Sequence, residues 1–380
     1  MSRPLIAFDV TMAPARPTGG SLYALNLARA LPTVDRDHDY VIYAKSHSLP
    51  LLEGVPATIV DVGPLRRLRR YVWEQFELPA DLKRRGVSLL HSPHYTLPLR
   101  RPCPCVVTVH DLTFFLLPGR FRATRRVPYQ LATFAASRLA DRIIVPSEST
   151  AADLRRVLKT RASKIVVTPE GAGPEFRPVE PEEAAEVAAK YGLKPGYLLS
   201  LGTREPNKNR GAIIRALHFL VSGGRDLQLA VVGGGGWRTE TEQAAIEGLG
   251  LTRRIDYTGY VEQEDLPALY SAAGVFLFPS LHEGFGLAAL EAMACGVPVV
   301  TSNTSSLPEV VGDAALMVNP QDPRALADAV ARILDDPALA ARLREDGPRR
   351  AAAFTWEACA EKTIAVYREL LGEATATPLT

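Results

Sequence analysis

The chain has 380 residues, of which 47% are hydrophobic and 23% are charged, and its formal net charge is +2. This length is large for one hydrophobic core and predicts two domains, while the composition is that of an ordinary globular protein. The four cysteines contain no C-x-x-C pair and have no histidine at zinc-ligand spacing, so we expect reduced, mostly buried thiols and no zinc site.

Targeting and membrane-spanning segments are not indicated. The first apolar run, Leu5–Val10, is too short for the core of a signal peptide and has no cleavage motif. No stretch reaches the length of about 18 consecutive apolar residues that a membrane-spanning helix needs. We expect a cytoplasmic protein, either soluble or peripheral at the inner face of the membrane.

Positive charge is concentrated in the first half of the chain. Residues 1–175 carry 25 Lys and Arg against 15 Asp and Glu, with clusters at Leu65–Arg70, Lys83–Arg85 and Arg122–Arg126. Such a face attracts an anionic membrane or a phosphorylated acceptor, although a solvated basic face without a partner is the alternative. No aromatic-interleaved motif accompanies the charge, so a nucleic-acid partner is not expected.

The first half alternates short apolar runs with longer amphipathic stretches, a pattern that favours a parallel sheet wrapped by helices. The predicted strands are Leu5–Val10, Tyr40–Ala44, Ala57–Val62, Leu89–Ser92, Cys105–His110, Arg142–Ser147 and Lys164–Glu170. The predicted helices include Ser21–Ala30, Arg125–Leu139 and Ser149–Leu158.

A stretch rich in Gly, Pro and Glu, Gly171–Glu183, is typical of an inter-domain linker, and alternation restarts after it. The next predicted strands are Tyr197–Gly202, Leu227–Gly233, Ile255–Gly259, Gly274–Ser280 and Pro298–Ser302. The helices expected among them are roughly Asn209–Ser222, Glu240–Leu249, Glu264–Ala272, Gly286–Cys295 and Pro323–Leu334. An alanine-rich tail, Pro337–Leu371, predicts a helix that is broken near Gly347–Pro348.

Two Rossmann-like domains of the α/β class follow from this alternation. We expect residues 1–175, with a C-terminal helix at 356–380, to form the first domain and residues 176–355 to form the second. Open α/β sheets bind ligands beyond the carboxyl ends of their strands. Two such domains facing each other across a cleft would suit an enzyme with one substrate on each domain.

The segment Ser280–Ser302, SLHEGFGLAALEAMACGVPVVTS, is the most informative in the chain. A predicted strand ends at Ser280, a glycine-containing turn follows, and a helix then begins. Glycines let the backbone approach a ligand, and the amides at a helix N-terminus attract a diphosphate. Carboxylates repel phosphate but accept hydrogen bonds from hydroxyls, so Glu283 and Glu291 are expected to hold sugar and ribose hydroxyls.

This segment resembles the signature of glycosyltransferase family 4, whose members have the GT-B fold and retain the configuration of the transferred sugar. The match consists of EGFGLAALE, in which seven residues separate the two glutamates, and of the continuation EAMACGVPVVTS. The resemblance implies that Glu283 holds the sugar and Glu291 the ribose. It also implies that the donor diphosphate is bound by backbone amides at the helix start, those of Gly284, Phe285, Gly286 and Leu287.

Two more segments of the second half resemble this family. GTREPNKN is similar to the loop that holds the donor phosphates. The resemblance implies a hydrogen bond from Thr203 and positive charge from Arg204 and Lys208, although Arg204 is slightly shifted from the family's arginine. DYTGYVEQEDL resembles the segment whose backbone meets the nucleobase, with Tyr260 and Val261 as the candidates.

The first half carries further matches. TVHDLTF places His110 at the carboxyl end of a strand, and the resemblance implies that it hydrogen-bonds the transferred sugar. PTGGSLYALNLARAL puts Gly19 and Gly20 in a loop that closes over the acceptor and the donor phosphate in this family. Asp9, just before that loop, is expected to face the acceptor. PEGAGPEF matches the hinge segment, and FTWEACAEKTIAVYREL matches the last helix, which crosses back to the first domain.

We therefore expect a retaining hexosyltransferase that uses a nucleotide-diphosphate sugar and strictly requires neither a metal nor another cofactor. The expected catalytic residues are His110, Lys208, Arg204 and Glu283, and the resemblance favours front-face attack without a covalent intermediate. GDP-mannose is the first choice of donor, and UDP-glucose or another UDP-sugar is the second. The acceptor is left open between a glycan, a lipid-linked glycan and a small molecule.

Rival interpretations are a protein that keeps the fold but has lost catalysis, another GT-B enzyme such as a phosphorylase or an epimerase, and an NAD oxidoreductase. VVGGGGW lacks the G-x-G-x-x-G spacing at a helix start, which disfavours NAD. Asp35-Arg36-Asp37 is a literal D-x-D, but it lies in a charged turn and is not expected to bind a metal.

Overall fold

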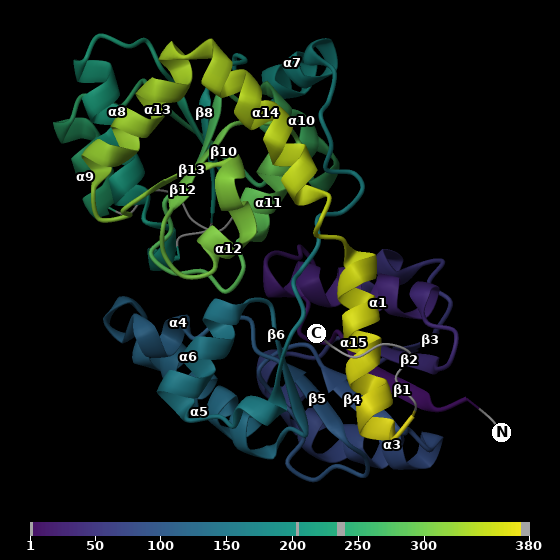
Figure 1. Ribbon diagram of the computed structural model, residues 1–380. Helices are drawn as coiled ribbons and strands as arrows, with labels where there is room; N and C mark the ends of the chain where they lie inside the picture. Colours follow the sequence, from purple (N-terminus) through teal and green to yellow (C-terminus); the bar gives the residue numbers. More distant parts are fainter. Residues whose placement is uncertain (1–2, 203–204, 234–239, 374–380) are drawn as a thin grey trace. The chain divides into compact units, whose positions relative to one another are not determined.

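The computed structural model of the chain describes residues 3–202, 205–233 and 240–373 (Figure 1). The chain divides into two compact units: unit 1 comprises Met1–Gly171 and Thr355–Thr380, and unit 2 comprises Ala172–Phe354. The first division therefore falls after Gly171 rather than after residue 175. The C-terminal helix belongs to unit 1, as the GT-B fold implies.

Unit 1 contains a seven-stranded parallel sheet in the order β3-β2-β1-β4-β5-β6-β7. Its strands are β1 (Leu5–Asp9), β2 (Asp39–Ala44), β3 (Thr58–Asp61), β4 (Leu89–Ser92), β5 (Cys105–Thr108), β6 (Arg142–Val145) and β7 (Ile165–Val167). Its helices are α1 (Gly20–Val34), α2 (Arg67–Val72), α3 (Leu78–Arg85), α4 (Thr113–Leu116), α5 (Ala123–Leu139), α6 (Glu148–Leu158) and α15 (Trp356–Leu371). The strand order reverses between β1 and β4, which is the switch point where such sheets bind ligands.

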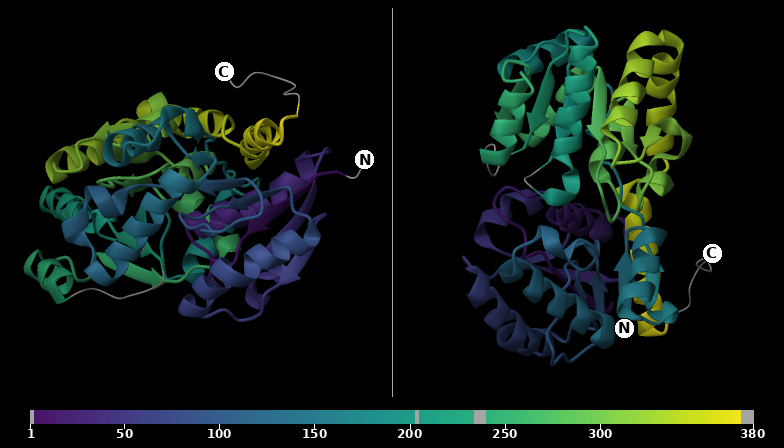
Figure 2. Two further views of the ribbon diagram at one scale, coloured as in Figure 1. Left: turned by 90° about the horizontal axis from the view of Figure 1, so that it is seen from below. Right: turned by 90° about the vertical axis from the view of Figure 1, so that its left-hand side faces the viewer.

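Helices cover both faces of the sheet of unit 1 (Figure 2). Alternate strand residues point to opposite faces, and one set packs with α3, α5 and α6. On the other face α15 lies beside α1, and Tyr367 Oη of α15 is 2.6 Å from His91 Nδ1 of β4. Ile364 and Val366 of α15 are buried, and each such side chain contributes about 1.5–3 kcal/mol. The C-terminal helix is thus an integral part of unit 1.

Unit 2 repeats this topology with a six-stranded parallel sheet in the order β10-β9-β8-β11-β12-β13. Its strands are β8 (Leu198–Leu201), β9 (Leu229–Val232), β10 (Ile255–Gly259), β11 (Val275–Phe278), β12 (Val299–Ser302) and β13 (Leu316–Val318). One face is covered by α7 (Pro181–Lys190), α10 (Leu266–Ala272), α11 (Leu287–Ala294) and α12 (Leu307–Val311). The other is covered by α8 (Arg210–Ser222), α9 (Glu240–Gly248), α13 (Pro323–Asp335) and α14 (Pro337–Ala351). The switch point of this sheet lies between β8 and β11.

The predicted break in the C-terminal tail is wrong in position. Helix α14 continues through Gly347 and Pro348 to Ala351. Gly347 packs so tightly on α11 that a Cβ there would lie 3.0 Å from the Met293 carbonyl oxygen. The helix ends instead at Ala351, three residues before the chain leaves unit 2 at Phe354. Helix α7 likewise begins at Pro181, inside the segment expected to be a linker.

The structure adds a helical stretch that was not predicted. Helices α2 and α3 are joined by a π-helical turn, Trp73–Glu77, so one continuous helix runs from Arg67 to Arg85. Within it the charged residues Arg70 and Glu74 are buried, whereas Leu68 is 82% exposed. Because buried charged residues interrupt the apolar inner face formed by Trp73, Leu78 and Leu82, the helical periodicity of this stretch is weak. Strand β13 was also not predicted.

Candidate active site

The loops at the switch point of unit 2 are tied to each other. After β8 the chain forms a short 3₁₀ turn, Pro206–Lys208, and after β11 it enters the loop that leads to α11. The amide of Leu281 in the second loop donates to the Asn207 carbonyl in the first, at 2.7 Å. Two predicted residues of the first loop, Thr203 and Arg204, lie outside the described residues. The described part of the loop nevertheless includes Lys208, so the position of this positively charged side chain is given by the structure.

The side chains of Lys208 and Glu283 meet between these loops. Lys208 Nζ lies 2.8 Å from Glu283 Oε1 and 4.7 Å from the centroid of the Phe278 ring. The two side chains are 20% and 12% exposed, so the ion pair is largely enclosed but reaches solvent. The site therefore offers a cation and a hydrogen-bond acceptor side by side, which suits a ligand that carries both phosphate and hydroxyl groups.

The turn before α11 is held from the neighbouring strand by two serines that follow β12. The amide of Glu283 donates to Ser305 Oγ at 3.0 Å. The hydroxyl of Ser306 donates to the carbonyl of Phe285 at 2.7 Å. Both contacts fix the backbone of the turn and not its side chains, so the course of the chain into the helix is set independently of any ligand.

Gly286 directs the chain from this turn into α11. Its φ is 113°, a conformation that favours glycine, and a Cβ there would lie 2.5 Å from Leu307 Cδ2. The amides of Ala289 and Leu290 donate to the Gly286 carbonyl, so the amides before them, beginning with Leu287, are those of the helix N-terminus. Gly284 and Phe285 are buried. This helix end attracts negative charge, and Lys208 lies in the loop tied to it.

Glu291 lies on α11 with its side chain inside unit 2. It is 6% exposed, and its Oε2 accepts a hydrogen bond from the Tyr270 hydroxyl at 3.2 Å. Burial and then the negative charge of Glu291 raise the pKa of Tyr270, so the phenol remains a donor. The carboxylate was expected to accept from ribose hydroxyls, and the structure gives it a protein hydroxyl as one of its partners.

Tyr260 and Val261 follow β10, the outer strand of the second sheet, at its carboxyl end. Tyr260 is half-buried, and Val261 is 5% exposed and belongs to the hydrophobic core. The contact predicted for these residues is between their backbone and a nucleobase. Burial of the Val261 side chain in the core therefore does not conflict with it. Their contact with a nucleobase stays a prediction.

His110 lies just beyond β5, at the carboxyl edge of the sheet of unit 1. Its Nε2 is 2.8 Å from the Pro93 carbonyl, and its Nδ1 is 3.5 Å from Glu170 Oε1. A carbonyl only accepts, so we assign a proton to Nε2, which leaves Nδ1 turned toward the Glu170 carboxylate. The ring is 8% exposed and packs edge-on against Tyr23. Its contact with a sugar stays a prediction.

The glycine loop between β1 and α1 packs on this histidine. A Cβ at Gly20 would come within 3.0 Å of both Cδ2 and Nε2 of His110, so only glycine fits without displacing the ring. Gly19 instead needs backbone freedom, because its φ is 52° and a Cβ there would touch nothing within 4 Å. The structure thus brings together two sequence features of unit 1 that were predicted separately.

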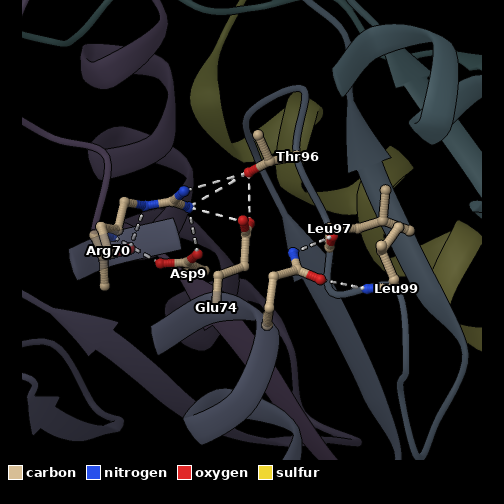
Figure 3. Close-up of polar contacts among 8 residues, drawn as sticks. Asp9, Arg70, Glu74, Thr96, Leu97 and Leu99 are labelled. Atoms are coloured by element: carbon tan, nitrogen blue, oxygen red, sulfur yellow. Dashed lines mark hydrogen bonds and ion pairs between the residues drawn. The ribbon is translucent and has the colours of Figure 1, made fainter. Parts of the chain in front are cut away.

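Asp9 ends β1, and its carboxylate points into a buried polar network (Figure 3). It is 1% exposed, with Oδ1 accepting from the Thr11 amide at 2.8 Å and Oδ2 lying 3.0 Å from Arg70 Nη2. The Asp9 carboxylate is thus bonded to Thr11 and Arg70. The contact of Asp9 with an acceptor stays a prediction. Arg70 and Glu74, which complete the network, were not singled out from the sequence.

Metal-binding groups and membrane spans were sought in the described part of the chain. Within residues 3–202, 205–233 and 240–373, no group of three or more His, Cys, Asp or Glu side chains is arranged to hold a metal ion. Over the same residues, no helix is both long enough and apolar enough to cross a membrane. Asp35 of the D-x-D sequence bonds His38 at 2.7 Å and also accepts from Tyr40.

Comparison with known proteins covers both units. Residues 17–176 match the family model described as Glycosyltransferase Family 4, and residues 182–350 match that of Glycosyl transferases group 1. The chain is 36% identical over 343 residues to the O-antigen chain mannosyltransferase B of Escherichia coli, spanning 90% of this chain and 87% of that protein. It is 33% identical over 393 residues to a D-inositol 3-phosphate glycosyltransferase of Streptomyces avermitilis, spanning 92% and 82%.

Among solved structures, Anabaena HepE in complex with UDP-glucose has a TM-score of 0.76 at 20% identity, with 96% of this chain and 99% of that chain covered. At this identity the likeness concerns the fold alone. It agrees with the two parallel sheets described above, each of which has its strand-order reversal next to predicted site residues.

Proposed function

The chain belongs to the family 4 and group 1 glycosyltransferases, and on this premise we propose that it transfers mannose from GDP-mannose to a glycan, lipid-linked or small-molecule acceptor. The observation that carries the proposal is the Lys208–Glu283 pair, which lies at the switch point of unit 2 beside the N-terminus of α11. Mannose is supported by the name of the Escherichia coli relative, a mannosyltransferase of the O-antigen chain.

The proposed chemistry depends on stabilising the leaving nucleoside diphosphate. Negative charge develops on its β-phosphate as the glycosidic bond breaks, and Lys208 with the amides at the start of α11 would oppose that charge. Glu283 would accept from sugar hydroxyls, Glu291 from the ribose, and His110 would position the hexose. We propose retention of configuration by front-face attack, with Arg204 and Lys208 taking the role that a metal ion has in other transferases.

Two alternatives differ from this proposal. A UDP-sugar donor is supported by HepE, which shares the fold and is solved with UDP-glucose. A catalytically silent nucleotide-sugar-binding protein would keep the same pocket without turnover. The presence of both Lys208 and Glu283 favours an active enzyme, because the proposed transfer uses both side chains.

A panel of GDP- and UDP-sugars tests the proposal. We expect GDP-mannose to raise the Tm and to be hydrolysed slowly to GDP, whereas UDP-glucose does neither. A ligand present at 100 times its Kd stabilises a protein by about 2.7 kcal/mol, which shifts Tm by several degrees. A response confined to UDP-sugars would overturn the donor assignment, and stabilisation without turnover would support the silent protein. If no nucleotide sugar in the panel raised the Tm or was hydrolysed, the glycosyltransferase proposal would be contradicted.

We also propose that unit 1 makes peripheral contact with an anionic membrane at the cytoplasmic face. In the described part of the chain, every exposed large hydrophobic side chain except Met317 lies in unit 1. One set, named here the α2 patch, consists of Leu68, Val72, Phe76 and Leu99, which are 82%, 48%, 73% and 62% exposed.

Arginines accompany the α2 patch. The first three of its residues are four positions apart on one helix, and Gln75 ties that helix to the Leu99 amide at 2.9 Å. Arg66, Arg69 and Arg100 beside it are exposed. An apolar stripe flanked by cations suits the interface of an anionic bilayer.

Vesicle flotation tests this contact. We expect the wild type to float with vesicles that contain phosphatidylglycerol but not with phosphatidylcholine alone. The Leu68→Ser/Phe76→Ser variant should bind at least about tenfold more weakly, because each buried side chain contributes about 1.5–3 kcal/mol. The matched control is Leu131→Ser/Phe134→Ser, which removes two exposed side chains of α5. Equal binding by the α2-patch variant and the wild type would refute the contact.

A further inference from the structure

A cluster of buried polar side chains lies at the switch point of unit 1, between the ends of β1 and β4 (Figure 3). The Arg70 cluster, as we name it, consists of Asp9, Arg70, Glu74 and Thr96. Asp9 ends β1, Thr96 lies in the loop after β4, and the other two come from the start of the α2–α3 helix. Ligands of open α/β sheets bind at this position, so the cluster occupies the place where a ligand of unit 1 is expected.

The guanidinium of Arg70 holds the Arg70 cluster together. Its Nη2 lies 3.0 Å from Asp9 Oδ2 and 3.3 Å from Glu74 Oε1, and its Nε donates to Thr11 Oγ1 at 3.0 Å. The hydroxyl of Thr96 donates to the same Glu74 oxygen. Each of the three charged side chains is at most 5% exposed. Such a network is stable only where its members satisfy one another.

One oxygen in the Arg70 cluster is not satisfied. Glu74 is 1% exposed, and among the described residues its Oε2 has no hydrogen-bond partner. Burial and the charge of Asp9 raise the pKa of Glu74 against the opposing effect of Arg70. Whether it accepts or donates, a buried carboxyl oxygen without a partner is unfavourable. A hydroxyl group that reached this oxygen would supply the missing hydrogen bond.

A second unsatisfied atom lies close by on the loop after β4. The Nε2 atom of His94 is buried and, within the described part of the chain, has no hydrogen-bond partner. Burial, followed by the charges of His110 and Arg70, lowers the pKa of His94, so its ring is neutral and offers one donor and one acceptor. His94 also packs against His110, with ring centroids 5.7 Å apart. The unsatisfied nitrogen therefore belongs to a ring that packs against the histidine expected to meet the transferred sugar.

The charges favour a neutral ligand over an anionic one. The two carboxylates of Asp9 and Glu74 compensate Arg70, whose N–H groups donate within the unit. The nearby cation is Lys45, which follows β2, and burial together with the charge of Arg70 lowers its pKa. Within the Arg70 cluster itself, two carboxylates face one guanidinium, so these residues supply no excess positive charge with which to attract a phosphate. Unsatisfied carboxyl and imidazole groups are suited instead to sugar hydroxyls, which both donate and accept.

We propose that the Arg70 cluster is the acceptor subsite, at which Glu74 and His94 hydrogen-bond hydroxyl groups of an uncharged sugar at the growing end of a glycan. This inference rests on the proposed glycosyltransferase function and adds the class of acceptor. Asp9 and Arg70 are positioning residues, because they hold the Glu74 carboxyl in place. A phosphorylated polyol, such as the name of the Streptomyces relative implies for that protein, would not fit this subsite.

Glu74→Gln tests the subsite, because it keeps the size of the side chain and changes its hydrogen-bonding groups. With methyl α-mannoside as the acceptor probe, we expect the acceptor KM to rise about 10- to 100-fold, the cost of one hydrogen bond to a charged or buried group. GDP affinity, a property of unit 2, should not change. Saturation-transfer NMR should show methyl α-mannoside bound to the wild type and mannose 6-phosphate not bound.

The matched control is Glu77→Gln, an identical change on the same π-helical turn, where the side chain is 49% exposed and pairs with Arg69. It should leave the acceptor KM unchanged. If Glu74→Gln fails to fold, His94→Gln replaces it with the same expected rise. An unchanged KM in the folded variant, or preference for mannose 6-phosphate, would overturn the inference. A wild type that neither binds GDP nor hydrolyses GDP-mannose would instead refute the underlying function.

Discussion

Transfer by a Lys208→Ala variant is expected to fall about 10²- to 10³-fold in kcat, the usual effect of removing one preorganised donor to a developing charge. The ammonium group lies 2.8 Å from Glu283 and in the loop tied to the start of α11, where the leaving diphosphate is proposed to sit. Alanine removes that charge and leaves the backbone of the loop in place. Single-turnover transfer from GDP-mannose measures the effect without a contribution from product release.

Stability separates this catalytic effect from damage to the fold. A partly solvated ion pair such as Lys208–Glu283 contributes about 1 kcal/mol or less, so the Tm of the variant should move little. The matched control is Lys190→Ala, which removes a lysine that pairs with Asp265 on the surface of the same unit and should transfer at the wild-type rate. A Lys208→Ala enzyme that transfers almost as fast as the wild type would refute the assigned site.

The fold could be predicted well where apolar residues recur with the spacing of a buried strand or of an amphipathic helix. Most strands of both sheets are short apolar runs that alternate with amphipathic helices. Their succession along the chain could therefore be recognised from the sequence. The α2–α3 helix could not be recognised, because it buries Arg70 and Glu74 and exposes Leu68 and Phe76. The burial of Arg70 and Glu74 depends on partners on distant segments, Asp9 and Thr96, which no local pattern reveals.

The candidate site could be predicted where a local motif defines its geometry, but not where its contacts come from distant segments. Glu283 and Gly286 stand in a motif in which the residue types themselves define a turn and a helix start. Tyr270 is one partner of Glu291, and the Pro93 carbonyl is one partner of His110. Both come from segments that are distant in the sequence. The burial of Asp9 beside Arg70 could not be predicted, because the arginine comes from another element.

A Gly286→Ala variant is expected to lose both stability and affinity for GDP. The new Cβ would lie 2.5 Å from Leu307 Cδ2, and alanine would have to adopt a φ of 113°. Backbone strain of this kind costs about 1–3 kcal/mol and overpacking of a buried site costs a similar amount, so we expect unfolding of unit 2 to be easier by about 2–5 kcal/mol. Relief of the clash moves the turn, and the amides at the start of α11 then lose their alignment with a diphosphate. Urea unfolding and GDP titration below the melting range measure the two effects.

The two causes can be separated with other residues of unit 2. Gly224 has a φ of 89°, and a Cβ there would meet nothing within 4 Å, so Gly224→Ala introduces strain without a clash and should leave GDP affinity intact. Adding Leu307→Val to Gly286→Ala removes the atom that the new methyl group would strike, and GDP affinity should partly return. If Gly286→Ala binds GDP as tightly as the wild type, the amides at the N-terminus of α11 do not bind the diphosphate. The donor site would then have to lie elsewhere on unit 2.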